Sequence, residues 1–154
     1  MNNDILHNIP FIAAALAVII AQASKPFINA IVDHRFDWSL LHSTGSMPSS
    51  HTAGVIALLT GIGMTEGIGT VDFAISMTFA AIVIHDAMGV RREAGKQAEV
   101  INEWSRILSD LHREGQFTPE NLKTMLGHSF SQVVGGIVVG LVVGFSITGY
   151  ILAH

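Results

Sequence analysis

The chain of 154 residues has no cysteine, and only 13% of its residues are charged. Without cysteine the protein has no disulfide, no thiolate nucleophile and no metal site built from thiolate ligands. Soluble domains carry about 25% charged residues. The shortage of charge, with a mean hydropathy of +0.49, is therefore typical of a membrane protein. We expect the bilayer as its partner and no nucleic acid.

Positive charge is missing from long parts of the chain. No lysine or arginine precedes residue 25, lies in the turn at 66–72 or follows residue 123. All eight fall in two polar loops, 25–51 and 91–131. Because cytoplasmic loops are enriched in Lys and Arg, we expect both loops in the cytoplasm and both termini outside the inner (plasma) membrane.

Four apolar stretches approach the roughly 20 residues that a helix needs to cross a bilayer. They cover residues 5–24, 52–70, 71–90 and 132–153. The second is short and rich in glycine. The first lacks a basic start and follows Asp4, so we expect a retained helix rather than a cleaved signal. The pattern predicts an all-α bundle of about four transmembrane helices in a single domain, 1–154.

The second loop has a helical pattern of its own. Its apolar residues recur at helical spacing, with charged residues between them. These apolar residues are Val100, Ile101, Trp104, Ile107, Leu108 and Leu111. We expect an amphipathic helix that lies on the membrane surface or on the core of the loop. Thr118-Pro119-Glu120 is typical of a helix start, so a short helix should run from there toward Leu126.

The predicted topology brings polar residues to the cytoplasmic face. Lys25 ends the first stretch, His51 opens the second, Arg91 and Arg92 follow the third, and His128 precedes the fourth. A phosphate monoester needs cations for its oxygens, a nucleophile, and an acid for the leaving alkoxide. Guanidinium, ammonium and imidazole groups supply these functions. The pattern therefore predicts a phosphate site at this face.

Two serines and an acid complete the candidate site. Ser49 and Ser50 can add hydrogen bonds to a phosphate, as can the amides that open the second helix. Asp86 is an ionisable residue near the mouth of a membrane helix, which makes it a functional candidate. The alternative is that Asp86 only forms a salt bridge with Arg91 or Arg92.

Several blocks resemble a known superfamily. Pro48-Ser49-Ser50-His51 resembles the Pro-Ser-Gly-His block of the PAP2 superfamily, the type 2 phosphatidic acid phosphatases and vanadium haloperoxidases. The segment 126–136 is similar to its closing block, in which a His precedes an Asp by four residues and a Gly-rich helix follows. More closely, segments 37–40, 45–51 and 86–95 resemble the small bacterial divergent PAP2 proteins. This likeness covers nearly the whole chain.

The resemblance implies a phosphatase that needs no metal or other cofactor. It makes His128 the nucleophile that forms a phosphohistidine, and His51 the acid that protonates the leaving oxygen. Lys25 matches the lysine that opens the superfamily's first block. The resemblance assigns Lys25, with one or both of Arg91 and Arg92, to the phosphate oxygens.

The chain also departs from the superfamily pattern. Gln132 stands where an Asp normally orients the nucleophilic histidine. A glutamine carbonyl can accept the imidazole N–H, but it cannot offset an imidazolium charge as a carboxylate would. Asp86 is the candidate that would supply the missing acid. In addition, the superfamily joins its arginine and its nucleophilic histidine in one compact block, whereas here the predicted amphipathic helix separates Arg92 from His128.

The leading hypothesis is a phosphatase for a lipid phosphomonoester such as phosphatidylglycerol phosphate, phosphatidate or a polyprenyl phosphate. The alternative is a non-catalytic membrane protein that binds anionic lipid through the same cations, and Gln132 favours it. A transporter or flippase subunit is a weaker fit, because four spans are few.

A stripe of small residues follows one side of the fourth stretch. Gly136, Gly140 and Gly144 would allow another helix to approach closely, either within one protomer or at a homodimer seam. Trp38 and Trp104 are typical of anchors at a membrane interface.

Overall fold

The computed structural model describes residues 5–32, 34–42, 46–111, 122 and 129–154. Every regular element within these ranges is a helix, which confirms the all-α class. The helices are η1 (Ile5–His7), α1 (Ile9–Val32), η2 (Trp38–His42), α2 (Ser50–Thr65), α3 (Val71–Met88), α4 (Val90–Leu111) and α5 (Phe130–Ala153).

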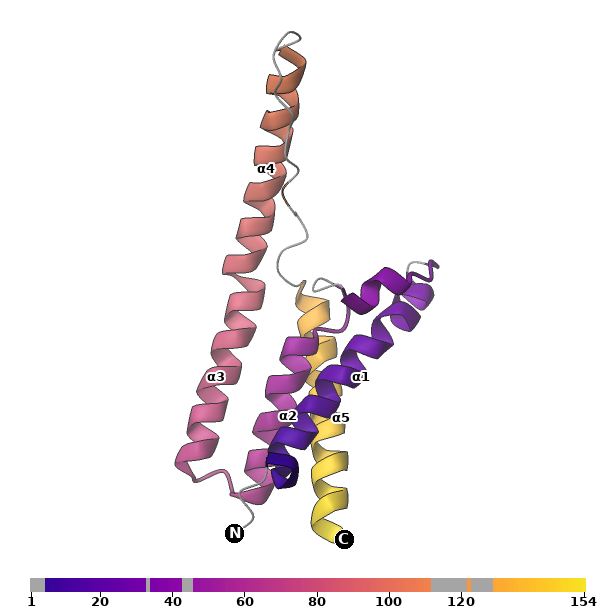
Figure 1. The fold of residues 1–154 in the computed structure, drawn as a ribbon. Helices are drawn as coiled ribbons and strands as arrows, with labels where there is room; N and C mark the ends of the chain where they lie inside the picture. The colour runs from indigo at the N-terminus through magenta and orange to yellow at the C-terminus, as the bar shows by residue number, and fades with distance from the viewer. Residues whose placement is uncertain (1–4, 33, 43–45, 112–121, 123–128) are drawn as a thin grey trace.

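The short helix α2 occupies the centre of the bundle. It packs against α5 and α1 most extensively, and also against α3 (Figure 1). The start of α1 and the end of α5 lie at the lower end of the bundle in Figure 1. The starts of α2 and α5 lie at the other end, toward which α1 and α3 run. The polar residues that flank these helix ends therefore belong to one end of the molecule.

Alanines allow α1 and α2 to pack closely. Ala17 and Ala21 of α1 form a fully buried cluster with Ala53 and Ala57 of α2. Side chains this small let two helix backbones approach each other. The core of the bundle therefore depends on close backbone contact rather than on large apolar side chains.

The predicted glycine stripe packs against α2. A Cβ atom on Gly136 would lie 2.6 Å from the carbonyl oxygen of Ser49, and one on Gly140 would lie 2.7 Å from that of Ala53. A Cβ on Gly144 would lie 2.8 Å from the Cβ of Thr60. These distances are too short for a real side chain, so the stripe serves a helix contact within this chain.

The first helix is longer than the sequence predicts. The apolar stretch was expected to end at residue 24, before Lys25 and Pro26, but α1 continues through both residues to Val32. Proline removes one backbone hydrogen bond inside a helix. Side-chain contacts support the extension, since Gln22 Nε2 donates to the carbonyl oxygen of Leu41 at 2.7 Å. Asn29 Nδ2 likewise donates to that of Arg35 at 2.6 Å.

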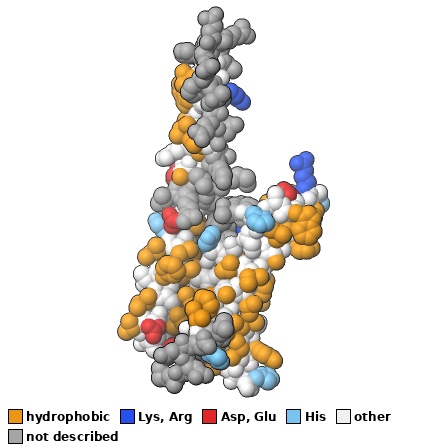
Figure 2. Space-filling view, viewed as in Figure 1, with side chains coloured by type: hydrophobic (Ala, Val, Ile, Leu, Met, Phe, Trp, Pro, Cys, Tyr) orange, Lys and Arg blue, Asp and Glu red, His pale blue; other side chains and the backbone are white. Residues whose placement is uncertain are grey.

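Three helices among the described residues are long and apolar enough to cross a membrane. They are α1, the long helical segment that begins with α3, and α5. The sequence predicted about four, and α2 accounts for the difference. It has only 16 residues, because it ends at Thr65, where the predicted turn at Glu66 begins. Large apolar side chains cover the visible outer surface of the bundle (Figure 2).

The expected amphipathic helix is present as α4. It follows α3 after Gly89 and projects beyond the bundle (Figure 1). Among the described helices it contacts only α3. It also contacts its own loop, because Asn102 Nδ2 donates to the Leu122 carbonyl oxygen and Asn102 Oδ1 accepts from the Leu122 amide, both at 2.9 Å. The large apolar side chains of its predicted face are exposed. The short helix expected from Thr118 to Leu126 falls outside the described residues.

Candidate phosphate site

The Pro-Ser-Ser-His block forms the start of α2. Ser49 is the N-cap, and its hydroxyl oxygen accepts from the amide of Thr52 at 3.3 Å and from the hydroxyl of Thr52 at 3.0 Å. Ser49 and Ser50 are buried, whereas His51 is exposed. The block therefore builds a rigid helix start with one imidazole on its accessible side.

The start of α2 touches the start of α5. The amide of Ser49 donates to the backbone carbonyl of Gln132 at 2.9 Å. Gly136, one turn further along α5, permits this contact because a Cβ there would meet the carbonyl oxygen of Ser49. His128 lies outside the described residues, but it directly precedes Ser129, the N-cap of α5. Two blocks that are about 80 residues apart in the sequence are thus joined by a backbone hydrogen bond between Ser49 and Gln132.

Gln132 has a structural task that the sequence analysis missed. Its Oε1 accepts from the amide of Ser129 at 3.0 Å, and the Ser129 hydroxyl accepts from the Gln132 amide at 3.4 Å. This reciprocal pair is a capping box, in which each side chain satisfies one amide at the helix start. A Ser followed three residues later by Gln is the signal that predicts it. The orientation of His128 by Gln132 stays a prediction.

Lys25 is buried in α1 near the end of the bundle where α2 begins. Its side chain has 0% exposed surface. A Cβ on Gly54 would meet Val18 at 2.6 Å, so these two residues are level on the antiparallel helices α1 and α2. Lys25 lies about two turns beyond Val18 along α1, and α2 begins about one turn before Gly54. A lysine is almost never fully buried unless its ammonium group has partners.

A further hydroxyl lies in the turn before α2. The side-chain oxygen of Ser46 is buried and has no hydrogen-bond partner among the described residues. A buried donor without a partner costs about 1–3 kcal/mol, which a bound acceptor would offset. Sequence reasoning missed Ser46 because a serine in a turn carries no signal of its own.

Asp86 and the two arginines lie where α3 meets α4. Asp86 is half-buried on the last turn of α3, and Arg91 and Arg92 belong to the first turn of α4. The side chains of the two arginines are outside the described part of the structure. The structure therefore joins Ser49 to Gln132, and the contacts of Lys25 and of the two arginines with this site stay predictions.

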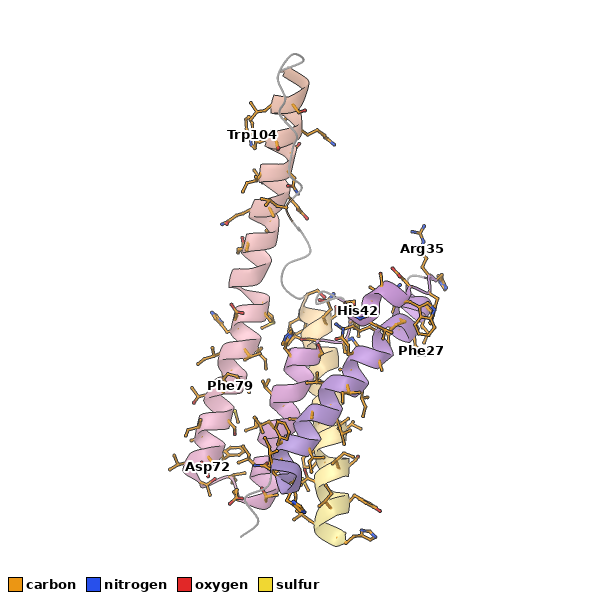
Figure 3. All side chains as sticks on the ribbon, viewed as in Figure 1. Phe27, Arg35, His42, Asp72, Phe79 and Trp104 are labelled. Atoms are coloured by element: carbon orange, nitrogen blue, oxygen red, sulfur yellow. The ribbon has the colours of Figure 1, made fainter. Side chains whose placement is uncertain are left out.

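The Asp37-Trp38-Ser39-Leu40 block caps the helix η2. The amide of Ser39 donates to Asp37 Oδ1 at 2.8 Å. Hydrogen bonds from the backbone and the side chain of Ser39 hold the pKa of the Asp37 carboxyl below its usual value. Arg35, in the same loop, points away from the bundle beyond the upper end of α1 (Figure 3). It is therefore unsuited to the site at the start of α2.

No group of three or more His, Asp or Glu side chains within the described ranges is arranged to hold a metal ion. The groups that meet at the starts of α2 and α5 are hydroxyls and amides, which can donate hydrogen bonds. Such groups bind an anion rather than a cation.

Comparison with known proteins gives two matches of nearly full length. The model of the Divergent PAP2 family matches residues 6–143. The chain is also 41% identical over 149 residues to YuiD, an uncharacterized membrane protein of Bacillus subtilis (strain 168), across 90% of this chain and 92% of that protein. No solved structure matches the chain. The resemblance read from the Pro48–His51 and Asp86–Gly95 blocks is confirmed, and the chain belongs to the Divergent PAP2 family.

Proposed function

We propose that this protein is a lipid-phosphate phosphatase of the membrane, which hydrolyses a phosphomonoester through a phosphohistidine on His128. The contact between the starts of α2 and α5 carries the proposal. It joins the helix whose first turn holds His51 to the helix that His128 precedes. Membership of the Divergent PAP2 family supports the same reading.

The start of α2 is suited to hold phosphate oxygens. The first four amides of a helix have no partner within it. Thr52 donates its amide to Ser49 and Ala53 donates to the Ser49 carbonyl. The amides of Ser50 and His51 have no acceptor among the described residues, so they could face an anion. Ser49 accepts both hydrogen bonds from Thr52, so its own hydroxyl proton remains to be donated. The positive end of the helix dipole adds to this attraction.

The proposed reaction has two steps. In the first, neutral His128 attacks phosphorus, the ester P–O bond breaks, and protonated His51 gives its proton to the leaving alkoxide. In the second, His51 takes a proton from water, the resulting hydroxide attacks phosphorus, and orthophosphate leaves His128. Lys25 and an arginine of the pair 91–92 would balance the charge on the phosphoryl oxygens in both steps.

Aromatic residues support an interfacial position for this end of the molecule. Phe27, Phe36 and Trp38 stack edge to face, with ring centroids 5.6 Å and 4.9 Å apart, and all three are exposed. Tryptophan is enriched where the bilayer meets water. A lipid could therefore present its phosphate to the start of α2 while its tail stays in the leaflet.

The second candidate function is binding of anionic lipid without hydrolysis. Gln132 favours it, because it replaces a carboxylate and its carbonyl oxygen already serves the capping box. An imidazolium at residue 128 would then lack a neighbouring charge of opposite sign unless Asp86 supplies it.

The test is orthophosphate release by the full chain in detergent. Phosphatidylglycerol phosphate, phosphatidate and a polyprenyl phosphate would be offered with and without a chelator. We expect wild-type activity on at least one of them, and a loss of about 100-fold or more in His51→Ala and His128→Ala. His154→Ala, which changes an exposed histidine at the opposite end, is the matched control and should retain activity.

Two results would decide against the proposal. Full activity in a folded His51→Ala or His128→Ala variant would exclude the assigned chemistry. Wild-type protein that binds all three lipids yet releases no orthophosphate would favour the non-catalytic alternative. Circular dichroism and gel filtration would show whether each variant is folded.

A further inference from the structure

A second recess lies at the opposite end of the bundle from the candidate phosphate site. It has a volume of about 610 Å³, and ligand sites typically occupy roughly 300–1,000 Å³. The start of α1, the end of α2 and the first half of α3 line it. Asp72 and Phe79, two of its lining residues, lie on the lower half of α3 (Figure 3). Lys25 follows Ile9, which lines the recess, by 16 residues, about 24 Å along α1.

The mouth of this recess carries negative charge. Glu66 and Asp72 line it, and none of its described lining residues is a lysine or arginine. Asp72 lies in the first turn of α3, where the helix dipole favours an acid. Glu66 is the C-cap of α2, where the dipole is negative and disfavours a carboxylate. A cation bound beside Glu66 would relieve this unfavourable position.

An apolar face of α3 adjoins the recess. Residues of this one helix form it: Val71, Ala74, Ile75, Thr78, Phe79 and Ile82. Ile75 and Phe79 also line the recess, so the apolar face continues from it. From Val71 to Ile82 the face follows α3 for about 17 Å. A small inorganic cation would leave this face uncovered, whereas an acyl chain would cover it.

We propose that the recess binds a membrane lipid whose headgroup carries an ammonium group. The ammonium would contact Glu66 and Asp72, and an acyl chain would lie along Ile75 and Phe79. A lipid with only negative charge in its headgroup meets two carboxylates and neither lysine nor arginine among the described lining residues, with His7 as the one titratable base there. This site belongs to the other leaflet and does not depend on the proposed phosphatase function.

The experiment compares two lipids with identical acyl chains, phosphatidylethanolamine and phosphatidylglycerol, bound to the full chain in detergent. Native mass spectrometry would measure the fraction of protein that retains each lipid. We expect wild-type protein to prefer phosphatidylethanolamine by about tenfold, the effect of one charge-assisted hydrogen bond. Glu66→Gln combined with Asp72→Asn should abolish that preference. Both residues are exposed, so these isosteric changes should not prevent folding.

Two further variants make the result specific. Glu99→Gln neutralises an exposed carboxylate on α4, outside the recess, and should keep the wild-type preference. Phe79→Ala should weaken the binding of both lipids, because it shortens the wall beside the acyl chain. Equal retention of the two lipids by wild-type protein, or an unchanged preference in the double variant, would overturn the proposal. Orthophosphate release by the double variant should equal that of wild type, which separates this site from the proposed phosphatase.

Discussion

Lys25 has no exposed surface, although lysines near the ends of membrane helices usually extend the ammonium group to the interface. Topology alone explains a lysine at a cytoplasmic helix end, but it predicts an exposed side chain. Burial of Lys25 near the end of the bundle where α2 begins is instead what the proposed role in holding an anion predicts. The identity of the residue was evident from the sequence, and its burial was not, because burial depends on how α1 packs against α2.

We predict that Lys25→Met lowers kcat/KM for the lipid phosphate by about 100-fold or more, because it removes a charge that stabilises the phosphoryl oxygens. Methionine keeps the volume and the apolar stem, so the variant should fold, and its melting temperature in detergent should not fall by more than a few degrees. Lys25→Arg keeps the charge and should retain part of the activity. An unchanged kcat/KM in Lys25→Met would remove Lys25 from the site.

Two features of single residues, at Ser46 and Gln132, were not predicted from the sequence. The unpartnered hydroxyl of Ser46 and the capping box of Gln132 depend on local backbone geometry. For Gln132 the spacing Ser-x-x-Gln is typical of a capping box. The family resemblance instead aligns Gln132 with the Asp that orients the nucleophilic histidine. The two roles are compatible, since an amide oxygen can accept two hydrogen bonds.

At the scale of helices, the pattern of apolar residues located α3 and α5 within a few residues. The same pattern did not predict the end of α1. Lys25-Pro26 is typical of the end of a helix, but α1 continues to Val32 because side-chain contacts stabilise its last turns. The pattern left the position of α4 open between the membrane surface and the loop, because an amphipathic face shows that a helix needs a partner but not where the helix lies. Helix direction is set by the junction at Gly89, which periodicity does not encode.

The contact between α2 and α5 yields a prediction at this scale. Gly136→Ala should lower the free energy of unfolding by about 1–3 kcal/mol, because the added Cβ would lie 2.6 Å from the Ser49 carbonyl oxygen and force the helices apart. Gly149→Ala is the matched control on the same helix, where the nearest atom, on Met64, is 3.8 Å away. It should be neutral or stabilise the helix by about 0.5–1 kcal/mol.

Thermal or denaturant unfolding in detergent would measure both variants. A Gly136→Ala variant as stable as wild type would show that α2 and α5 tolerate a wider separation. Because the same contact joins Ser49 to Gln132, Gly136→Ala should also reduce orthophosphate release more than Gly149→Ala does.

At the scale of the whole molecule, the distribution of lysine and arginine predicts which end faces the cytoplasm. The structure adds that the start of α1 and the end of α5 share one end of the bundle and that the starts of α2 and α5 share the other. The sequence predicts which helix ends lie together, because successive membrane helices alternate in direction. It does not predict the depth of the recess, which depends on helix tilt and on side-chain size.

The absence of cysteine makes the orientation directly testable. Ile68→Cys places a single thiol in the exposed turn between α2 and α3, and Glu99→Cys places one on α4. A maleimide that cannot cross membranes should label Ile68→Cys in intact cells and should label Glu99→Cys only after permeabilisation. The reverse pattern would invert the orientation and move the phosphate site to the outer face.

The brevity of α2 has a consequence for how a substrate arrives. α5 begins six residues before Gly136, which meets Ser49, so α5 extends about 9 Å beyond this contact along its own axis. The start of α2 therefore lies below the start of α5 (Figure 1). A headgroup drawn to that depth would still leave its glycerol or isoprenoid portion level with neighbouring lipids. Water-soluble phosphate esters, which have no tail to hold them there, should be poor competitors.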